Sequence, residues 1–143
     1  MTIDQISVFV ENKPGRLTEI TEILGEAGID LRAMSIADTA DFGILRIIVS
    51  EPVRTLEVLR KADCVVSVTQ VLAVAIEDAP GSLSKVLRIL SDAGVSVEYL
   101  YAFITRTKGN AYVIFRVEDT GRATALFAEH GVKTADTHEL YDL

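Results

Sequence analysis

The chain has 143 residues, of which 49% are hydrophobic. This is enough to form a hydrophobic core that needs no metal ion or disulfide bond to stabilise it. Its 14 Lys and Arg residues stand against 21 Asp and Glu residues, a formal net charge of −7. That balance excludes the basic surface that nucleic acids and anionic membranes attract, and we expect neither as a partner. A single cysteine, Cys64, excludes an internal disulfide.

The amino-terminal residues do not resemble a secretion signal, because no basic stretch precedes an apolar core. No uninterrupted apolar run approaches the roughly 18–20 residues that span a bilayer. We therefore expect a cytoplasmic protein.

The sequence contains an internal repeat with a shift of 66 residues. Nine positions within 8–31 are identical to those 66 residues further on, where composition alone gives about one or two. The identical pairs are Val8/Val74, Glu11/Glu77, Pro14/Pro80, Gly15/Gly81, Leu17/Leu83, Ile23/Ile89, Leu24/Leu90, Ala27/Ala93 and Gly28/Gly94. The repeat predicts two copies of one unit, 1–70 and 71–143.

In the first copy, alternating apolar residues predict a strand at 6–10, and helical spacing after Gly15 predicts a helix that ends at Gly28. Two strands follow at about 30–37 and 42–49. A proline suited to a first turn starts a helix over 53–62, and a last strand covers 65–69.

The second copy repeats this order with strands at 72–76, 95–103, 111–117 and 132–137 and helices at 83–93 and 120–129. We therefore predict an α+β protein of two tandem ferredoxin-like βαββαβ units, each an antiparallel sheet with its helices on one face. Residues 65–76 favour strand almost continuously, which predicts that the halves are tightly joined.

The sheet face away from the helices is expected to be apolar in both copies. The residues assigned to it are Met34, Ile36, Ile44 and Ile48 in the first copy and Leu100, Ala102, Tyr112 and Ile114 in the second. Such a surface is covered by the other copy or by a second chain more often than by water, so we expect a homodimer.

The segment from Asn12 to Leu17 is the candidate ligand-binding loop. Pro14 and Gly15 turn the chain sharply into the helix, leaving the first amides, around Gly15 to Leu17, without intrahelical partners at the positive end of the dipole. This geometry suits a carboxylate, and Asn12 adds a donor and an acceptor for a zwitterionic amino acid. The same turn is also common where no ligand binds.

Each of the two copies opens with a stretch that resembles the start of an ACT domain. In the first copy this stretch is residues 12–17, the helix that follows and its exit at 28–31, and in the second copy it is residues 78–83 with 94–97. The resemblance covers nearly the whole chain and implies a regulatory module of amino-acid metabolism that binds a free amino acid between paired domains. A freestanding tandem pair is similar to small regulatory proteins, including relatives of the acetolactate synthase regulatory subunit, so an amino-acid biosynthetic enzyme is the expected protein partner.

The resemblance also implies which residues bind the ligand. In the first copy they are Asn12, Pro14, Gly15, Arg16, Leu17 and Asp30, and in the second Asp78, Pro80, Gly81, Ser82, Leu83 and Ser96. The first copy departs from the family where Asp30 replaces a frequent asparagine. In the second, Asp78 would repel a ligand carboxylate, so we expect unequal sites with the first loop the stronger.

We expect no catalytic residue, no metal and no cofactor. His130 and His138 are eight positions apart without further ligands at metal spacing, and Cys64 has no paired base. Two alternatives to an amino-acid sensor remain. One is a ligand-free interaction module that docks on a biosynthetic enzyme, and the other is a small ferredoxin-like enzyme, which requires an enclosed cavity with a shifted acid or base.

Overall fold

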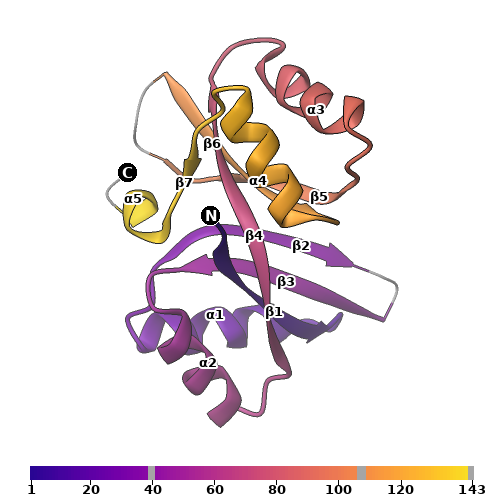
Figure 1. Cartoon of the computed structure of the whole chain (residues 1–143). Coiled ribbons are helices and arrows are strands. Elements are labelled where there is room, and N and C mark those ends of the chain that lie inside the picture. Colours follow the sequence, from indigo (N-terminus) through magenta and orange to yellow (C-terminus); the bar gives the residue numbers. More distant parts are fainter. Residues whose placement is uncertain (39–40, 106–108, 142–143) are drawn as a thin grey trace. The chain divides into compact units, whose positions relative to one another are not determined.

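The computed structural model describes residues 1–38, 41–105 and 109–141 (Figure 1). The chain divides into two compact units. The N-terminal unit is Asp4–Thr69, and the C-terminal unit is Gln70–Leu143 together with Met1–Ile3.

The N-terminal unit is an antiparallel sheet with two helices. Its elements are β1 (Ile3–Glu11), α1 (Arg16–Glu26), β2 (Leu31–Asp38), β3 (Phe42–Val49), α2 (Pro52–Lys61) and the start of β4 (Val66–Glu77). β3 lies between β1 and β2, and β1 also pairs with β4. Apolar residues of both helices, such as Leu24 and Leu59, form one buried core with Val8 and Ile47 of the strands, so both helices cover the same face (Figure 1).

The C-terminal unit repeats this plan. It contains the rest of β4, α3 (Ser82–Asp92), β5 (Val97–Phe103), β6 (Asn110–Val117), α4 (Thr120–Glu129), β7 (Thr134–Ala135) and α5 (Thr137–Tyr141). The strand order is β5-β6-β4-β7. Phe115 and Phe127 meet edge to face in its core, with ring centroids 6.3 Å apart. The α+β content and the antiparallel pairing are as predicted, and the strand order in each unit is consistent with the ferredoxin-like arrangement.

The predictions for 65–69 and 72–76 merge into the single strand β4 of 12 residues. By contrast, the predicted strand at 132–137 is mostly wrong, because β7 has two residues and a short helix, α5, follows it. The reason is a capping box. The Glu139 amide donates to Asp136 Oδ1 (2.9 Å) and the Asp136 amide donates to Glu139 Oε2 (3.0 Å), which starts a helix instead.

The assignment of Met34 and Ile36 to the face away from the helices is also wrong. Met34 lies opposite Ile47 and Ile36 opposite Leu45, and both partners belong to the core beneath the helices. A bulge between Leu31 and Ala33 adds one residue to β2 and reverses its alternation.

The same bulge recurs between Val97 and Tyr99 in the C-terminal unit. It places Leu100 opposite Phe115 and Ala102 opposite Val113, on the helix-covered face again. Ile44, Ile48, Tyr112 and Ile114 do lie on the opposite face, by their alternation with these core residues. No helix among the described residues is both long enough and apolar enough to cross a bilayer.

Candidate functional site

The two strand–helix loops share one backbone conformation. Helix α1 begins at Gly15, whose φ is 87°, and α3 begins at Gly81, whose φ is 86°. Within the described ranges neither helix start has a side-chain cap, whereas Asp119 Oδ1 caps α4 by accepting from the Arg122 amide. The left-handed backbone at both positions is one that glycine adopts without cost.

Of the amides predicted to be free, from Gly15 to Leu17, that of Arg16 is bonded within the loop. The Arg16 amide donates to the Lys13 carbonyl (3.2 Å), so it is not available to a ligand. The first helical bond to the cap runs from the Glu19 amide to the Gly15 carbonyl (2.9 Å). Between them, the amides of Leu17 and Thr18 have no acceptor among the described residues, at the positive end of the helix dipole.

A small hollow, called the loop hollow here, lies at this turn. It has a volume of about 110 Å³ and is lined by Val10, Glu11, Asn12, Lys13, Leu17, Ile36 and Gly43. A cavity of roughly 150 Å³ holds one benzene molecule. The loop hollow is therefore the size of a ligand head group and does not enclose a large amino acid.

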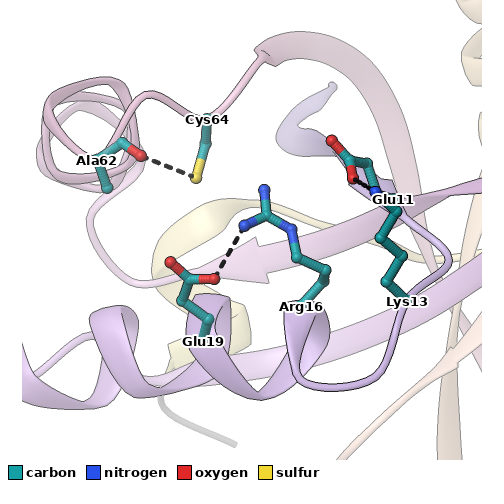
Figure 2. A network of polar contacts seen from close by, with 6 residues as sticks. All are labelled: Glu11, Lys13, Arg16, Glu19, Ala62 and Cys64. Carbon is teal, nitrogen blue, oxygen red and sulfur yellow. Dashed lines mark hydrogen bonds and ion pairs between the residues drawn. The ribbon is translucent and has the colours of Figure 1, made fainter.

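A larger hollow, called the Arg16 hollow here, opens at the same end of β1. Its volume is about 310 Å³, and its lining comes from β1, α1 and residues 62–65. Figure 2 shows Arg16 extending from the first turn of α1, with Nη1 3.0 Å from Glu19 Oε2 and Cys64 facing it across the hollow. The predicted site residues of the first loop thus divide, because Asn12 and Leu17 line one hollow and Arg16 lines the other.

Asp30 does not join the loop of its own unit. Glu11 at the end of β1 lies opposite Phe42, whereas Leu31 at the start of β2 lies opposite Val49. The two β3 positions are seven residue steps apart, which corresponds to roughly 23 Å of strand. Asp30 instead lies 3.4 Å from Arg32 Nε in an ion pair, at the opposite end of the sheet.

The second loop has a similar arrangement. Asp78 and Pro80 are exposed before Gly81, and Leu83 is 36% exposed. Ser82 lines a third hollow of about 350 Å³, called the Lys85 hollow here, at the end of β4. Ser96 precedes β5, and its carbonyl accepts from the Glu118 amide (3.1 Å) at the end of the sheet away from Gly81.

Two titratable groups at the Arg16 hollow have shifted pKa values. The Lys13 ammonium, 3.1 Å from Glu11, and then Arg16 hold the pKa of the Glu11 carboxyl below its usual 4.5. Partial burial raises the pKa of the Cys64 thiol above 9.0, so the thiol is protonated at neutral pH and is a poor nucleophile. Over the described residues, no group of three His, Cys, Asp or Glu side chains is placed to hold a metal ion.

Sequence reasoning missed two residues at these hollows. Ile36 reaches the loop hollow because the β2 bulge turns it to the helix side. Asp63 lines the Arg16 hollow from the end of α2, where its φ is 61°. The signal for Asp63 was a non-glycine residue directly after a predicted helix, at the position where glycine usually ends one.

Both a family model and solved structures match the chain. The family model for the ACT domain pair matches residues 1–143. Protein BT0572 from Bacteroides thetaiotaomicron, known from a crystal structure, is 40% identical, with a TM-score of 0.93 over 100% of this chain and 98% of that chain. No curated protein matches the chain significantly in sequence.

Two more distant solved structures show the same fold. The ligand-free regulatory subunit of aspartate kinase from Thermus thermophilus is 16% identical, with a TM-score of 0.63 over 88% of this chain and 91% of that chain. The corresponding subunit from Thermus flavus is 15% identical, with a TM-score of 0.62 over 96% and 92%. Because the family model matches all 143 residues of the chain, the chain belongs to the ACT domain pairs, a family of regulatory modules.

Proposed function

We propose that this protein is a non-catalytic regulator that binds a free amino acid at the strand–helix loop of its N-terminal unit. In this proposal each half, 1–70 and 71–143, is one ACT-like domain. The observation that carries the proposal is the start of α1, where the amides of Leu17 and Thr18 are uncapped beside the loop hollow. Helix-start amides of this kind bind carboxylates, and Asn12 on the hollow's rim supplies polar groups for the ammonium.

The second loop supports a weaker site. Asp78 stands where the first loop has Asn12, and an ionised aspartate repels the carboxylate of an incoming amino acid. The proposed effect of binding is on a biosynthetic enzyme of amino-acid metabolism, with the protein acting as a homodimer in the cytoplasm. The Thermus chains that share the fold are regulatory subunits of an enzyme of this kind, aspartate kinase.

Thermal unfolding in the presence of each of the twenty amino acids tests this proposal. A ligand at 100 times its Kd adds about 2.7 kcal/mol to the free energy of unfolding. For a chain of this length, that corresponds to a rise in Tm of roughly 5–10 °C. Asn12→Ala should abolish the rise, whereas Glu57→Ala on the exposed side of α2 serves as a matched control that keeps it. If no amino acid raises Tm, the sensing proposal is wrong.

A specific observation also favours the alternative of a ligand-free interaction module. The side chains of Leu17, Met34 and Ile36 in the N-terminal unit are 40–49% exposed. In the C-terminal unit, the residues at the positions of Leu17 and Met34 are Leu83 and Leu100, which are 36% and 38% exposed. Exposed apolar residues at matching places in both units are typical of a docking surface. Co-purification of a biosynthetic enzyme that is unchanged by every amino acid, and lost in Met34→Asp, would select this alternative.

A further inference from the structure

The Arg16 hollow has the size and lining of a small-molecule site. Its volume of about 310 Å³ falls at the lower end of the roughly 300–1,000 Å³ found for ligand pockets. Ile20, which is buried, and the half-buried Ile23 supply an apolar floor, and Phe9 adds an aromatic side. An apolar floor with a charged rim is the usual lining of a site for an amphipathic molecule.

Of the charged side chains that line the Arg16 hollow, all but one form an ion pair, Glu11 with Lys13 outside the lining. Glu11 Oε2 lies 3.1 Å from Lys13 Nζ, and Glu19 Oε2 lies 3.0 Å from Arg16 Nη1 (Figure 2). The carboxylate of Asp63 has no ion pair or hydrogen bond with any other described residue. The hollow therefore presents one uncompensated negative charge, which favours a ligand with a single positive charge.

The backbone conformation at Asp63 is one that favours glycine over an aspartate. Asp63 follows the last turn of α2 with a φ of 61°, and it is the one non-glycine residue with positive φ in the described ranges. In the C-terminal unit the residue after the last turn of α4 is Gly131, with a φ of 68°. Glycine adopts this conformation without the steric cost that an L side chain meets, so the fold alone favours glycine at Asp63.

The corresponding hollow of the C-terminal unit shows that the fold does not require this charge pattern. The Lys85 hollow lies between the end of β4, the first turn of α3 and the residues after α4. Ser82 stands where the other unit has Arg16, Lys85 replaces Glu19, and Gly131 replaces Asp63. The two hollows share their place in the fold, but the balance of charge is reversed.

We propose that the Arg16 hollow binds a primary ammonium group carried on a short apolar body. Asp63 accepts hydrogen bonds from the ammonium, and Ile20 and Ile23 pack against the apolar part. This site differs from the loop hollow of the proposed function, because the ammonium is held from the α2 side and the uncapped amides of α1 take no part. Free alkylamines and apolar amino acids both carry this chemistry.

The test is a titration of the ¹⁵N-labelled protein with isopentylamine, followed by amide chemical shifts. Isopentylamine should give saturable shifts at Ile20, Ile23 and Asp63. Isopentanol, the neutral molecule of matched shape, should bind about two- to fivefold more weakly, which is the effect of one exposed ion pair. Isovalerate, with the opposite charge, should produce no shifts there.

Two variants separate the ligand contact from stability. Asp63→Asn keeps the shape and removes the charge, so it should remove the difference in affinity between isopentylamine and isopentanol. Asp63→Gly should abolish the preference for the amine while leaving Tm unchanged or higher, because glycine suits the positive φ. Equal binding of amine and alcohol by the unmodified chain, or an undiminished preference in Asp63→Asn, would overturn the proposal.

Leucine distinguishes the two sources of the ammonium and separates this site from the loop. Leucine shifts at Ile20 and Ile23 that survive Asn12→Ala and disappear in Asp63→Asn would identify an amino acid as the occupant. Shifts with isopentylamine alone would identify free amines, and both outcomes support the site. If leucine acts only through Asn12 and isopentylamine shifts none of these amides, the Arg16 hollow is not a site and the loop proposal stands.

Discussion

Two glycines of the N-terminal unit provide a matched test of the loop geometry. Gly15 precedes α1 with a φ of 87°, and Gly25 lies inside the last turn of α1 without a positive φ. A Cβ atom added at either glycine meets no heavy atom within 4 Å. Each change to alanine therefore adds one methyl group to open space, and the two differ only in backbone conformation.

The expected effects have opposite signs. Alanine inside a helix is more favourable than glycine by up to about 1 kcal/mol, so Gly25→Ala should raise the free energy of unfolding. An L residue in the left-handed region costs roughly 1–2 kcal/mol, so Gly15→Ala should lower it. The variants should thus differ by about 1.5–3 kcal/mol, which corresponds to roughly 3–12 °C in Tm for a chain of this length.

Urea unfolding followed by far-UV circular dichroism measures the difference as a shift in the transition midpoint. Gly81→Ala repeats the experiment in the second loop, where φ is 86°, and should cost as much as Gly15→Ala. If Gly15→Ala and Gly25→Ala shift the midpoint in the same direction, the left-handed cap is not what sets the start of α1, and the placement of the uncapped amides loses its basis.

Three further predictions follow from individual contacts. Phe127→Ala should cost about 3–5 kcal/mol, because Phe127 is fully buried against Phe115, and equilibrium unfolding measures this loss. Asp136→Ala should cost about 0.5–2 kcal/mol by removing the cap of α5, which would be seen as faster amide exchange at Leu140 and unchanged exchange in the N-terminal unit. The pKa of the Glu11 carboxyl should lie below 4.5 by NMR titration and rise in Lys13→Ala. Since a depressed folded-state pKa stabilises the fold above the unfolded pKa, that contribution should be lost as pH falls through the folded value, and a titration unchanged by Lys13→Ala would contradict this assignment.

Most of the fold could be predicted because the sequence contains the same pattern of strands and helices twice. The shift of 66 residues aligns the strand, the Pro-Gly turn and the helix of both copies, and the uninterrupted strand formers of 65–76 indicate β4. The face of β2 could not be predicted, because alternation assumes an unbroken period of two. One extra residue between Leu31 and Ala33 reverses every side chain that follows it.

The candidate site was predictable where the backbone is set by residue type. Pro14 and Gly15 indicate the turn, and the left-handed cap follows from glycine. The Arg16 hollow was not predictable, because its lining joins residues about fifty positions apart on α1 and after α2. The sequence marks Asp63 only by its position directly after a predicted helix, and the positive φ that distinguishes it from an ordinary surface aspartate is visible only in the structure.

The two loops show how binding specificity can change while the fold does not. The amides of Asn12 and Asp78 each donate to a carbonyl across the sheet at 3.0 Å, and the turn bonds to the Lys13 and Ala79 carbonyls are both 3.2 Å. The backbone is therefore the same in both loops although the side chains at these positions differ. The Pro-Gly pair and the β-strand pairing fix the backbone of both loops. The side chain at the position of Asn12 and Asp78 can therefore differ, and it determines the charge that a ligand meets. We therefore expect Asp78→Asn to leave Tm without ligand nearly unchanged and to give the second loop a response to the amino acid that the first loop binds. A thermal titration in the Asn12→Ala background isolates that gain, and its absence would show that the difference between the loops lies outside this residue.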